Sequence, residues 1–123
     1  MERIGNILPD RKEGIEKLRD YRPRYTVVLH AVRHELALSV THYCVIDSIH
    51  KLSRMHESHL WCTMSKDNMA AFLGLSRRTV FNAIAEGLRK GIIEKNDRGD
   101  LRTSEKWMRL VEIYDIREAK KRR

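Results

Sequence analysis

Residues 66–84 read KDNMAAFLGLSRRTVFNAI, and this stretch predicts two helices joined by a tight turn. Gly74 supplies the left-handed backbone that ends the first helix, because glycine has no side chain to oppose that conformation. Ser76 follows as the cap of the second helix, since its hydroxyl can accept a hydrogen bond from an amide of the first turn. Ala70 and Val80 are small or apolar, as required where two helices cross closely. Together these residues indicate a packed helix–turn–helix unit.

A short hairpin is expected directly after the second helix, which ends at Gly91. Ile92 and Ile93 begin a strand, residues 96–99 (NDRG) are a hairpin turn signal, and residues 101–103 (LRT) return as its partner. The helix itself packs through an apolar stripe at helical spacing, which comprises Val80, Ala83, Ile84, Gly87 and Leu88.

The residues before this unit predict a first core helix and a third strand. Ser39 or Thr41 caps the helix, which ends near Arg54. Its buried face comprises Cys44, Val45, Ile49 and Leu52. Residues 55–59 are polar and predict a loop, and residues 60–64 (LWCTM) predict a strand that pairs with the hairpin. Ser65 then caps the next helix, whose buried side comprises Met69, Phe72 and Leu73.

The two ends of the chain are harder to assign. Residues 1–24 form a polar arm with one short helix beginning at Asp10, and either the arm docks on another surface or it has no fixed structure. Residues 25–32 are rich in β-branched side chains, which favours a strand, but we prefer a helix that continues toward Glu35. Ser104 opens a last helix with an apolar side of Trp107, Leu110, Val111 and Tyr114.

These assignments divide the chain into an arm (1–24), a single domain (25–114) and a basic tail (115–123) whose final residues read KKRR. The predicted fold is mainly α, with a core of three helices, a small β-hairpin, and extra helices at the N- and C-terminal ends. The apolar last helix is also a candidate surface for a homodimer, and the tail is expected to contact phosphates.

Composition points to a polyanionic partner. The chain of 123 residues has a formal net charge of +8, and its isoelectric point is near 9.8. Lysine and arginine supply most of the non-specific affinity of proteins for DNA. Cys44 and Cys62 are too few for a disulfide framework, and no apolar run is long enough to cross a bilayer. We therefore expect a cytoplasmic, nucleoid-associated protein without a membrane partner.

The second helix of the unit carries the main candidate site. Counting about 100° per residue places four side chains opposite the apolar stripe, namely Arg78, Asn82, Ala85 and Arg89. Arg78 can pair with guanine and Asn82 with adenine, each through two hydrogen bonds in the major groove. The N-terminal end of this helix suits a phosphate and comprises Ser76, Arg77 and Thr79.

Three further residues extend this candidate site. Arg98 at the hairpin tip and Arg102 on the returning strand have the position and charge to meet phosphates or the minor groove. Asp97 and Asp100 oppose that role, so a hairpin that only stabilises the fold is a competing interpretation. Phe81, at the edge of the outer face, is suited either to contact a thymine methyl or to support the hairpin.

No catalytic or metal site is expected. His56, His59 and Cys62 have a spacing that zinc could use, as do His30 and His34, but neither set makes a closed pattern of four ligands. No nucleophile elbow, phosphate loop or paired carboxylate motif is present. We therefore predict a protein that is not an enzyme, and that has no metal, no cofactor and no small-molecule ligand.

Residues 39–107 resemble the winged-helix domain at the N-terminus of phage and plasmid replication proteins, and related phage-type helix-turn-helix proteins. The segments that carry the resemblance are 39–43 (SVTHY), 47–49 (DSI), 61–66 (WCTMSK), 75–80 (LSRRTV), 91–95 (GIIEK) and 101–107 (LRTSEKW). The resemblance implies a DNA-binding domain that recognises an origin or an operator. Replication initiation and transcription regulation both stay open at this point.

The sequence thus predicts a winged helix-turn-helix protein that binds double-stranded DNA, with residues 76–90 lying in the major groove. The alternative is a winged-helix module that binds another protein or a second copy of itself, without specific DNA binding.

Overall fold

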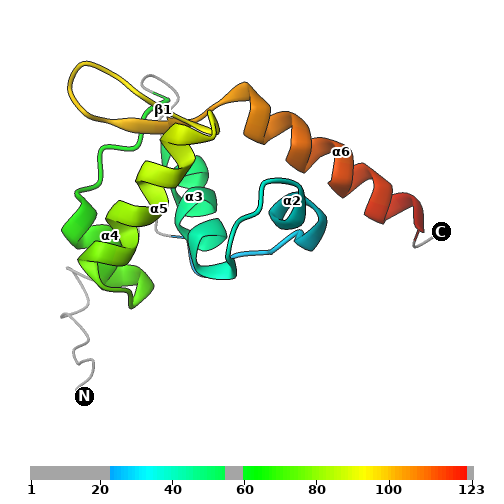
Figure 1. Cartoon of the computed structure of the whole chain (residues 1–123), viewed down its shortest axis with the longest axis horizontal. Coiled ribbons are helices and arrows are strands. Elements are labelled where there is room, and N and C mark those ends of the chain that lie inside the picture. The colour runs from blue at the N-terminus through cyan, green and yellow to red at the C-terminus, as the bar shows by residue number, and fades with distance from the viewer. Residues whose placement is uncertain (1–22, 55–59, 122–123) are drawn as a thin grey trace, which may run out of the picture.

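The computed structural model describes residues 23–54 and 60–121, and this part of the chain is mainly helical with one small antiparallel sheet (Figure 1). The elements are, in order, α2 (His30–Glu35), α3 (Val40–Ser53), α4 (Lys66–Leu73), α5 (Arg77–Arg89), β1 (Ile93–Lys95), β2 (Leu101–Thr103) and α6 (Glu105–Lys121). The expectation of a mainly helical fold with a small hairpin is confirmed. The expected helix after Asp10 and the expected loop at 55–59 lie outside the described residues.

Serine caps begin the three central helices, as the sequence predicts. Ser39, Ser65 and Ser76 precede α3, α4 and α5, and each hydroxyl accepts a hydrogen bond of 3.1 Å from the amide three residues later. Gly74 ends α4 with φ 70° and ψ 32°, which is the left-handed conformation expected there. The turn between α4 and α5 is therefore set by hydrogen bonds and backbone angles that local sequence dictates.

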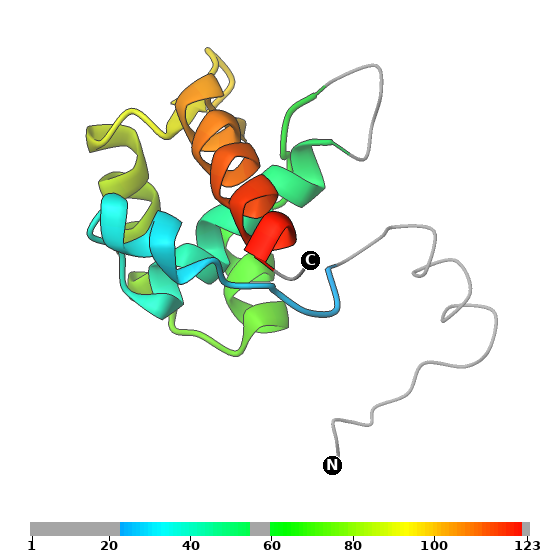
Figure 2. The same ribbon diagram turned by 90° about the vertical axis from the view of Figure 1, so that its right-hand side faces the viewer.

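The core lies around α3, which packs against α5 and β2, while α4 packs against α5. Figures 1 and 2 show α3 in the middle of the molecule, with α4 and α5 on one side and α6 on the other. Val45, Ile49 and Leu52 are buried as expected, but Cys44 is only half-buried. The sequence prediction missed two buried hydrophobic side chains of this helix, Tyr43 and Ile46.

Trp107 of α6 completes the core from the other side. Only 1% of its surface is exposed, and its ring centre lies 5.0 Å from that of Tyr43, with 54° between the ring planes. This tilted arrangement is one that aromatic pairs prefer. Trp107 is therefore a core residue of the single chain.

The hairpin pairs β1 with β2 in antiparallel register, with Ile93 opposite Thr103 and Lys95 opposite Leu101. Gly99 takes a φ of 87° in the connecting turn. The expected third strand at residues 60–64 is wrong in extent, because only Cys62 pairs, through a single bridge to Leu101. Both backbone hydrogen bonds between these two residues are present, at 2.6 and 3.2 Å.

The preferred helix at residues 25–32 is also mostly wrong. Residues 23–29 have no regular structure, and α2 begins only at His30. The β-branched run Thr26, Val27 and Val28 disfavours a helical backbone there. The segment instead packs Val28 and Leu29 against the core.

The last helix extends beyond the domain boundary expected at residue 114, because α6 continues without a break to Lys121. The helix packs on β2 and on α2, which lies beside it in Figures 1 and 2. In its second half, Ile113 and Ile116 have 46% and 49% of their surface exposed to solvent. None of the helices described here has both the length and the apolar character that crossing a membrane requires.

Candidate nucleic-acid interface

The outer face of α5 is the candidate interface. Val80, Ala83, Ile84 and Gly87 are buried, whereas the four side chains predicted to point outward are all exposed, namely Arg78, Asn82, Ala85 and Arg89. Within the described residues, the side chains of Arg78 and Asn82 have no hydrogen-bond or ion-pair partner. The direction of each side chain of α5 thus follows the helical period read from the sequence.

Gly87 lets α5 and the hairpin approach closely. A Cβ atom at this position would lie 2.5 Å from Cδ1 and 2.8 Å from Cγ1 of Ile93, so a larger residue would require the Ile93 side chain or β1 itself to shift. The hairpin is thereby held at a fixed distance from the C-terminal half of α5.

Glu86 anchors the opposite edge of α5. Its carboxylate lies 2.7 Å from Nδ1 of His42 on α3 and 3.2 Å from Nζ of Lys90. Burial raises the pKa of Glu86, but the hydrogen bonds from His42 and Lys90 outweigh burial and hold the pKa below its ordinary value. Lys90 also donates to the carbonyl oxygens of Leu36 and Ala37, after α2. These contacts fix how α5 is presented to solvent.

The N-terminal end of α5 carries the three residues predicted to suit a phosphate. The hydroxyls of Ser76 and Thr79 lie 2.8 Å apart, so each is partly engaged by the other. Arg77 is exposed, and its Nε lies 3.1 Å from a carboxylate oxygen of Asp67 in the first turn of α4. A helix begins with amides that have no partner inside the helix, and these amides favour an anion. The geometry fits the predicted role, with Asp67 as a competing charge.

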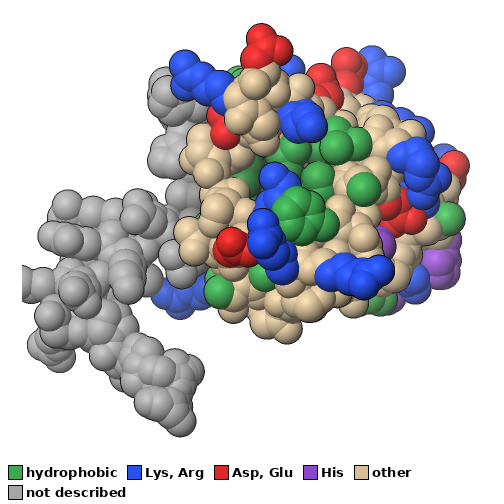
Figure 3. All heavy atoms as spheres, turned by 60° about the vertical axis from the view of Figure 1, so that its left-hand side comes forward, with side chains coloured by type: hydrophobic (Ala, Val, Ile, Leu, Met, Phe, Trp, Pro, Cys, Tyr) green, Lys and Arg blue, Asp and Glu red, His purple; other side chains and the backbone are tan. Residues whose placement is uncertain are grey.

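Lys66 is a cation of this region that the sequence analysis did not single out. Its Nζ lies 5.5 Å from the ring centre of Phe81, and the guanidinium carbon of Arg77 lies 5.1 Å from the same ring centre. The signal for Lys66 was available, because it follows the cap Ser65 just as Arg77 follows Ser76. Figure 3 shows the side of the molecule that carries α4, α5 and the hairpin, where Lys and Arg side chains lie around apolar ones.

Of the two hairpin arginines predicted to contact DNA, Arg98 is the more exposed. Arg98 is exposed in a turn that the Asn96 side chain organises, since Oδ1 of Asn96 accepts hydrogen bonds from the amides of Arg98 and Asp100. This turn presents the arginine on a defined backbone.

Arg102 is partly exposed and contacts two neighbouring side chains instead. Its guanidinium carbon lies 4.2 Å from the ring centre of Trp61, and its Nε lies 3.6 Å from the carboxylate of Glu94. Successive side chains of a strand point to opposite faces, so Arg102 and Glu94 point away from the face through which Ile93 meets α5. The structure therefore does not bring Arg102 together with the residues of α5.

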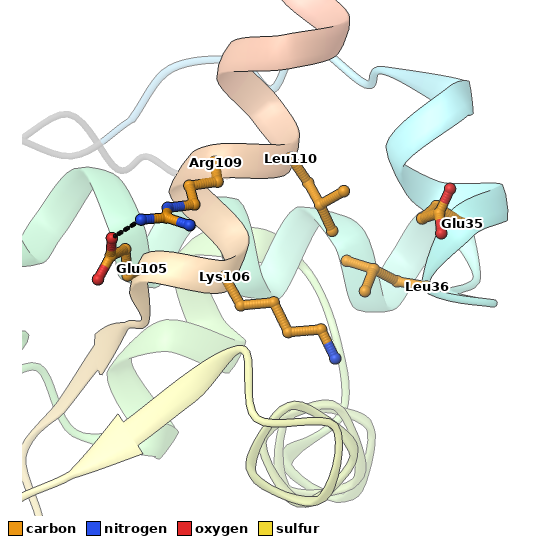
Figure 4. A pocket seen from close by; sticks show the side chains of 6 residues that line it. All are labelled: Glu35, Leu36, Glu105, Lys106, Arg109 and Leu110. Atoms are coloured by element: carbon orange, nitrogen blue, oxygen red, sulfur yellow. Dashed lines mark ion pairs between the residues drawn. The ribbon is translucent and has the colours of Figure 1, made fainter.

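A hollow away from the outer face of α5 lies at the other side of the molecule. It has a volume of about 530 Å³ and lies between α2 and α6, where Leu36 and Leu110 point toward each other and Arg109 pairs with Glu105 (Figure 4). Its lining mixes both signs of charge, with two glutamates, one lysine and one arginine. Among the described residues, no three His, Cys, Asp or Glu side chains are grouped to hold a metal ion. His56 and His59 lie outside the described residues.

Comparison of the chain with protein families, with curated proteins and with solved structures found no match.

Proposed function

We propose that this chain is a winged helix-turn-helix protein that binds double-stranded DNA in a sequence-dependent way, with α5 in the major groove. The observation that carries the proposal is the outer face of α5, where Arg78 and Asn82 are exposed beside Arg89 and have no side-chain partner among the described residues. An α-helix fits the major groove, and arginine and asparagine are the side chains that pair with guanine and adenine there. The order of α3, α4, α5 and the hairpin supports the same proposal.

Charge supports the proposal as well. The formal net charge is +8, and the first turns of α4 and α5 present Lys66 and Arg77. Cations placed beside a base-reading helix are suited to fix its position on the phosphate backbone. Arg98 at the hairpin tip is suited to a neighbouring phosphate or to the minor groove.

The first experiment measures binding to a random-sequence duplex over a range of salt concentrations, by fluorescence anisotropy. Each neutralised phosphate contributes about −0.9 to the slope of log affinity against log salt, so three or four engaged cations predict a slope of about −3. A protein that binds no duplex, or binds with a flat salt dependence, would refute the proposal.

The second experiment tests base reading, on a preferred duplex selected from random sequences. Arg78→Ala and Asn82→Ala are each expected to cost about 1 to 3 kcal/mol on the preferred duplex and to relax preference at one position. Arg109→Ala is the matched control, because it removes an exposed cation from α6 and is expected to leave the base preference unchanged. Equal losses on preferred and random duplexes would show that Arg78 and Asn82 contact only phosphates.

A second candidate function, a protein-interaction module, has one observation in its favour. Ile113 and Ile116 are both about half exposed and lie three residues apart, which places them on one side of α6. The sequence left open whether the apolar side of α6 packs on its own domain or on a second copy, and this side packs on its own domain, with Trp107 buried. A homodimer would therefore use Ile113 and Ile116. Sedimentation at high micromolar concentration tests for this homodimer, and a monomer with and without DNA would rule the homodimer out.

A further inference from the structure

Phe81 is a large apolar side chain that the fold leaves in solvent on the binding side of α5. It is 40% exposed, although buried positions for apolar side chains lie on the same helix at Val80 and Ile84. It directly precedes Asn82, one of the two proposed base-reading residues. Neighbouring residues of a helix point about 100° apart, so Phe81 lies at the edge of the outer face, next to the side chains that point directly outward.

Two cations accompany this ring. The ammonium of Lys66 and the guanidinium of Arg77 both lie within cation–π distance of the ring, and each belongs to the first turn of its helix. Such a contact at an exposed site stabilises a protein only weakly, so the cluster adds little to the stability of the fold. The cluster joins an apolar surface to two groups that bind phosphate.

We infer that Phe81 contacts the C5-methyl group of a thymine in the major groove, while Lys66 and Arg77 bind the phosphates beside that base. The inference rests on the proposed function, and it adds a thymine to the bases that α5 reads. Thymine is the base that presents a methyl group in the major groove, and an apolar side chain is the group that recognises it. The arrangement matches this chemistry, because the DNA backbone and the base edge present a phosphate and a methyl group close together.

The test uses the preferred duplex and replaces one thymine at a time by uracil, which removes the methyl group and keeps the base pair. At one or two positions the wild-type protein is expected to bind the uracil duplex about fourfold more weakly. This factor corresponds to the free energy of exposing one group the size of a methylene to water. Phe81→Ala is expected to bind the thymine and uracil duplexes equally. Phe81→Leu, which keeps an apolar side chain, is expected to retain part of the difference.

Two sets of control variants separate the ring from the cations and from apolar surface in general. Lys66→Ala and Arg77→Ala are expected to weaken binding to all duplexes and to reduce the salt slope by about one each, with the thymine-to-uracil ratio unchanged. Ile113→Ala removes a similarly exposed apolar side chain from α6 and is expected to leave the ratio unchanged. Thermal melts of all variants confirm that the proteins compared are folded.

Three results would overturn the inference. A uracil scan without any weakened position would remove the methyl contact while leaving DNA binding in place. If Phe81→Ala lost the same factor of affinity for the thymine duplex as for the uracil duplex, the ring would only position Lys66 and Arg77. A larger loss for this variant on single-stranded DNA than on duplex would show that the ring stacks on unpaired bases. Absence of duplex binding by the wild-type protein would instead remove the proposed function itself.

Discussion

Gly87→Ala tests the contact that sets the distance between α5 and the hairpin. Two effects of opposite sign compete at this position. Alanine is the better helix former by about 1 kcal/mol, which favours the variant. Its Cβ atom, however, would lie 2.5 Å from Cδ1, 2.8 Å from Cγ1 and 3.3 Å from Cβ of Ile93. Because a β-branched side chain has few alternative rotamers, Ile93 cannot relieve all three contacts by rotation.

Overpacking of this kind costs about 1 to 3 kcal/mol, which exceeds or equals the gain in helix propensity. The free energy of unfolding of Gly87→Ala is therefore expected to fall by up to about 2 kcal/mol. Urea unfolding followed by circular dichroism measures the difference at equilibrium. Ala85→Gly is the matched control, since the same pair of residues is exchanged at an exposed position of α5 and only the propensity loss of about 1 kcal/mol is expected.

A double-mutant cycle with Ile93→Ala isolates the steric term. Without the Ile93 side chain beyond Cβ, the added methyl group of Gly87→Ala fills space instead of colliding, so a coupling of about 1 to 3 kcal/mol is expected. The reasoning fails if Gly87→Ala alone is more stable than wild type by as much as Ala85→Gly is less stable, because the collision would then have no cost.

Three further predictions concern stability. Trp107→Ala is expected to cost about 3 to 5 kcal/mol in urea unfolding, since the ring is buried against Tyr43, and a loss below about 1 kcal/mol would contradict a core role. Gly74→Val is expected to cost about 1 to 3 kcal/mol and to abolish the proposed DNA binding, because valine opposes a φ of 70°; an unchanged melting temperature would contradict the turn geometry. Burial lowers the pKa of His50 from its ordinary value of 6.5, and its ring lies 2.7 Å from the Thr103 hydroxyl. The contribution of neutral His50 to the free energy of unfolding is therefore expected to be fully present above pH 6.5 and to decrease as the pH drops below it. The loss between pH 6.5 and 5 is expected to be smaller in His50→Gln, and an identical pH profile would exclude this contribution.

Local features of the fold could be predicted from the sequence because they depend on groups only a few residues apart. The caps at Ser39, Ser65 and Ser76 each accept from an amide three residues later, and the left-handed turn at Gly74 depends on that residue alone. The orientation of the α5 side chains follows from the helical period, so the exposed face of the candidate site was predictable as well.

Features that depend on distant residues were not predictable. Periodicity places Trp107 on an apolar face but cannot say whether a domain or a second chain covers that face, and the contact with Tyr43 decided it. The strand expected at 60–64 shortened to one bridge at Cys62, because pairing depends on how far the chain stays beside β2.

The residues of the candidate site also fall into those that the sequence placed and those that only tertiary packing placed. The sequence alone determined that α5 carries Arg78 and Asn82 on its outer face, since a helix repeats its directions at a fixed angle. Only the tertiary structure decided that Arg102 packs over Trp61 and that Phe81 lies beside Lys66. Each of these contacts joins residues from different elements, and their distances depend on how whole helices and strands pack, which short-range hydrogen bonds and residue spacing do not specify.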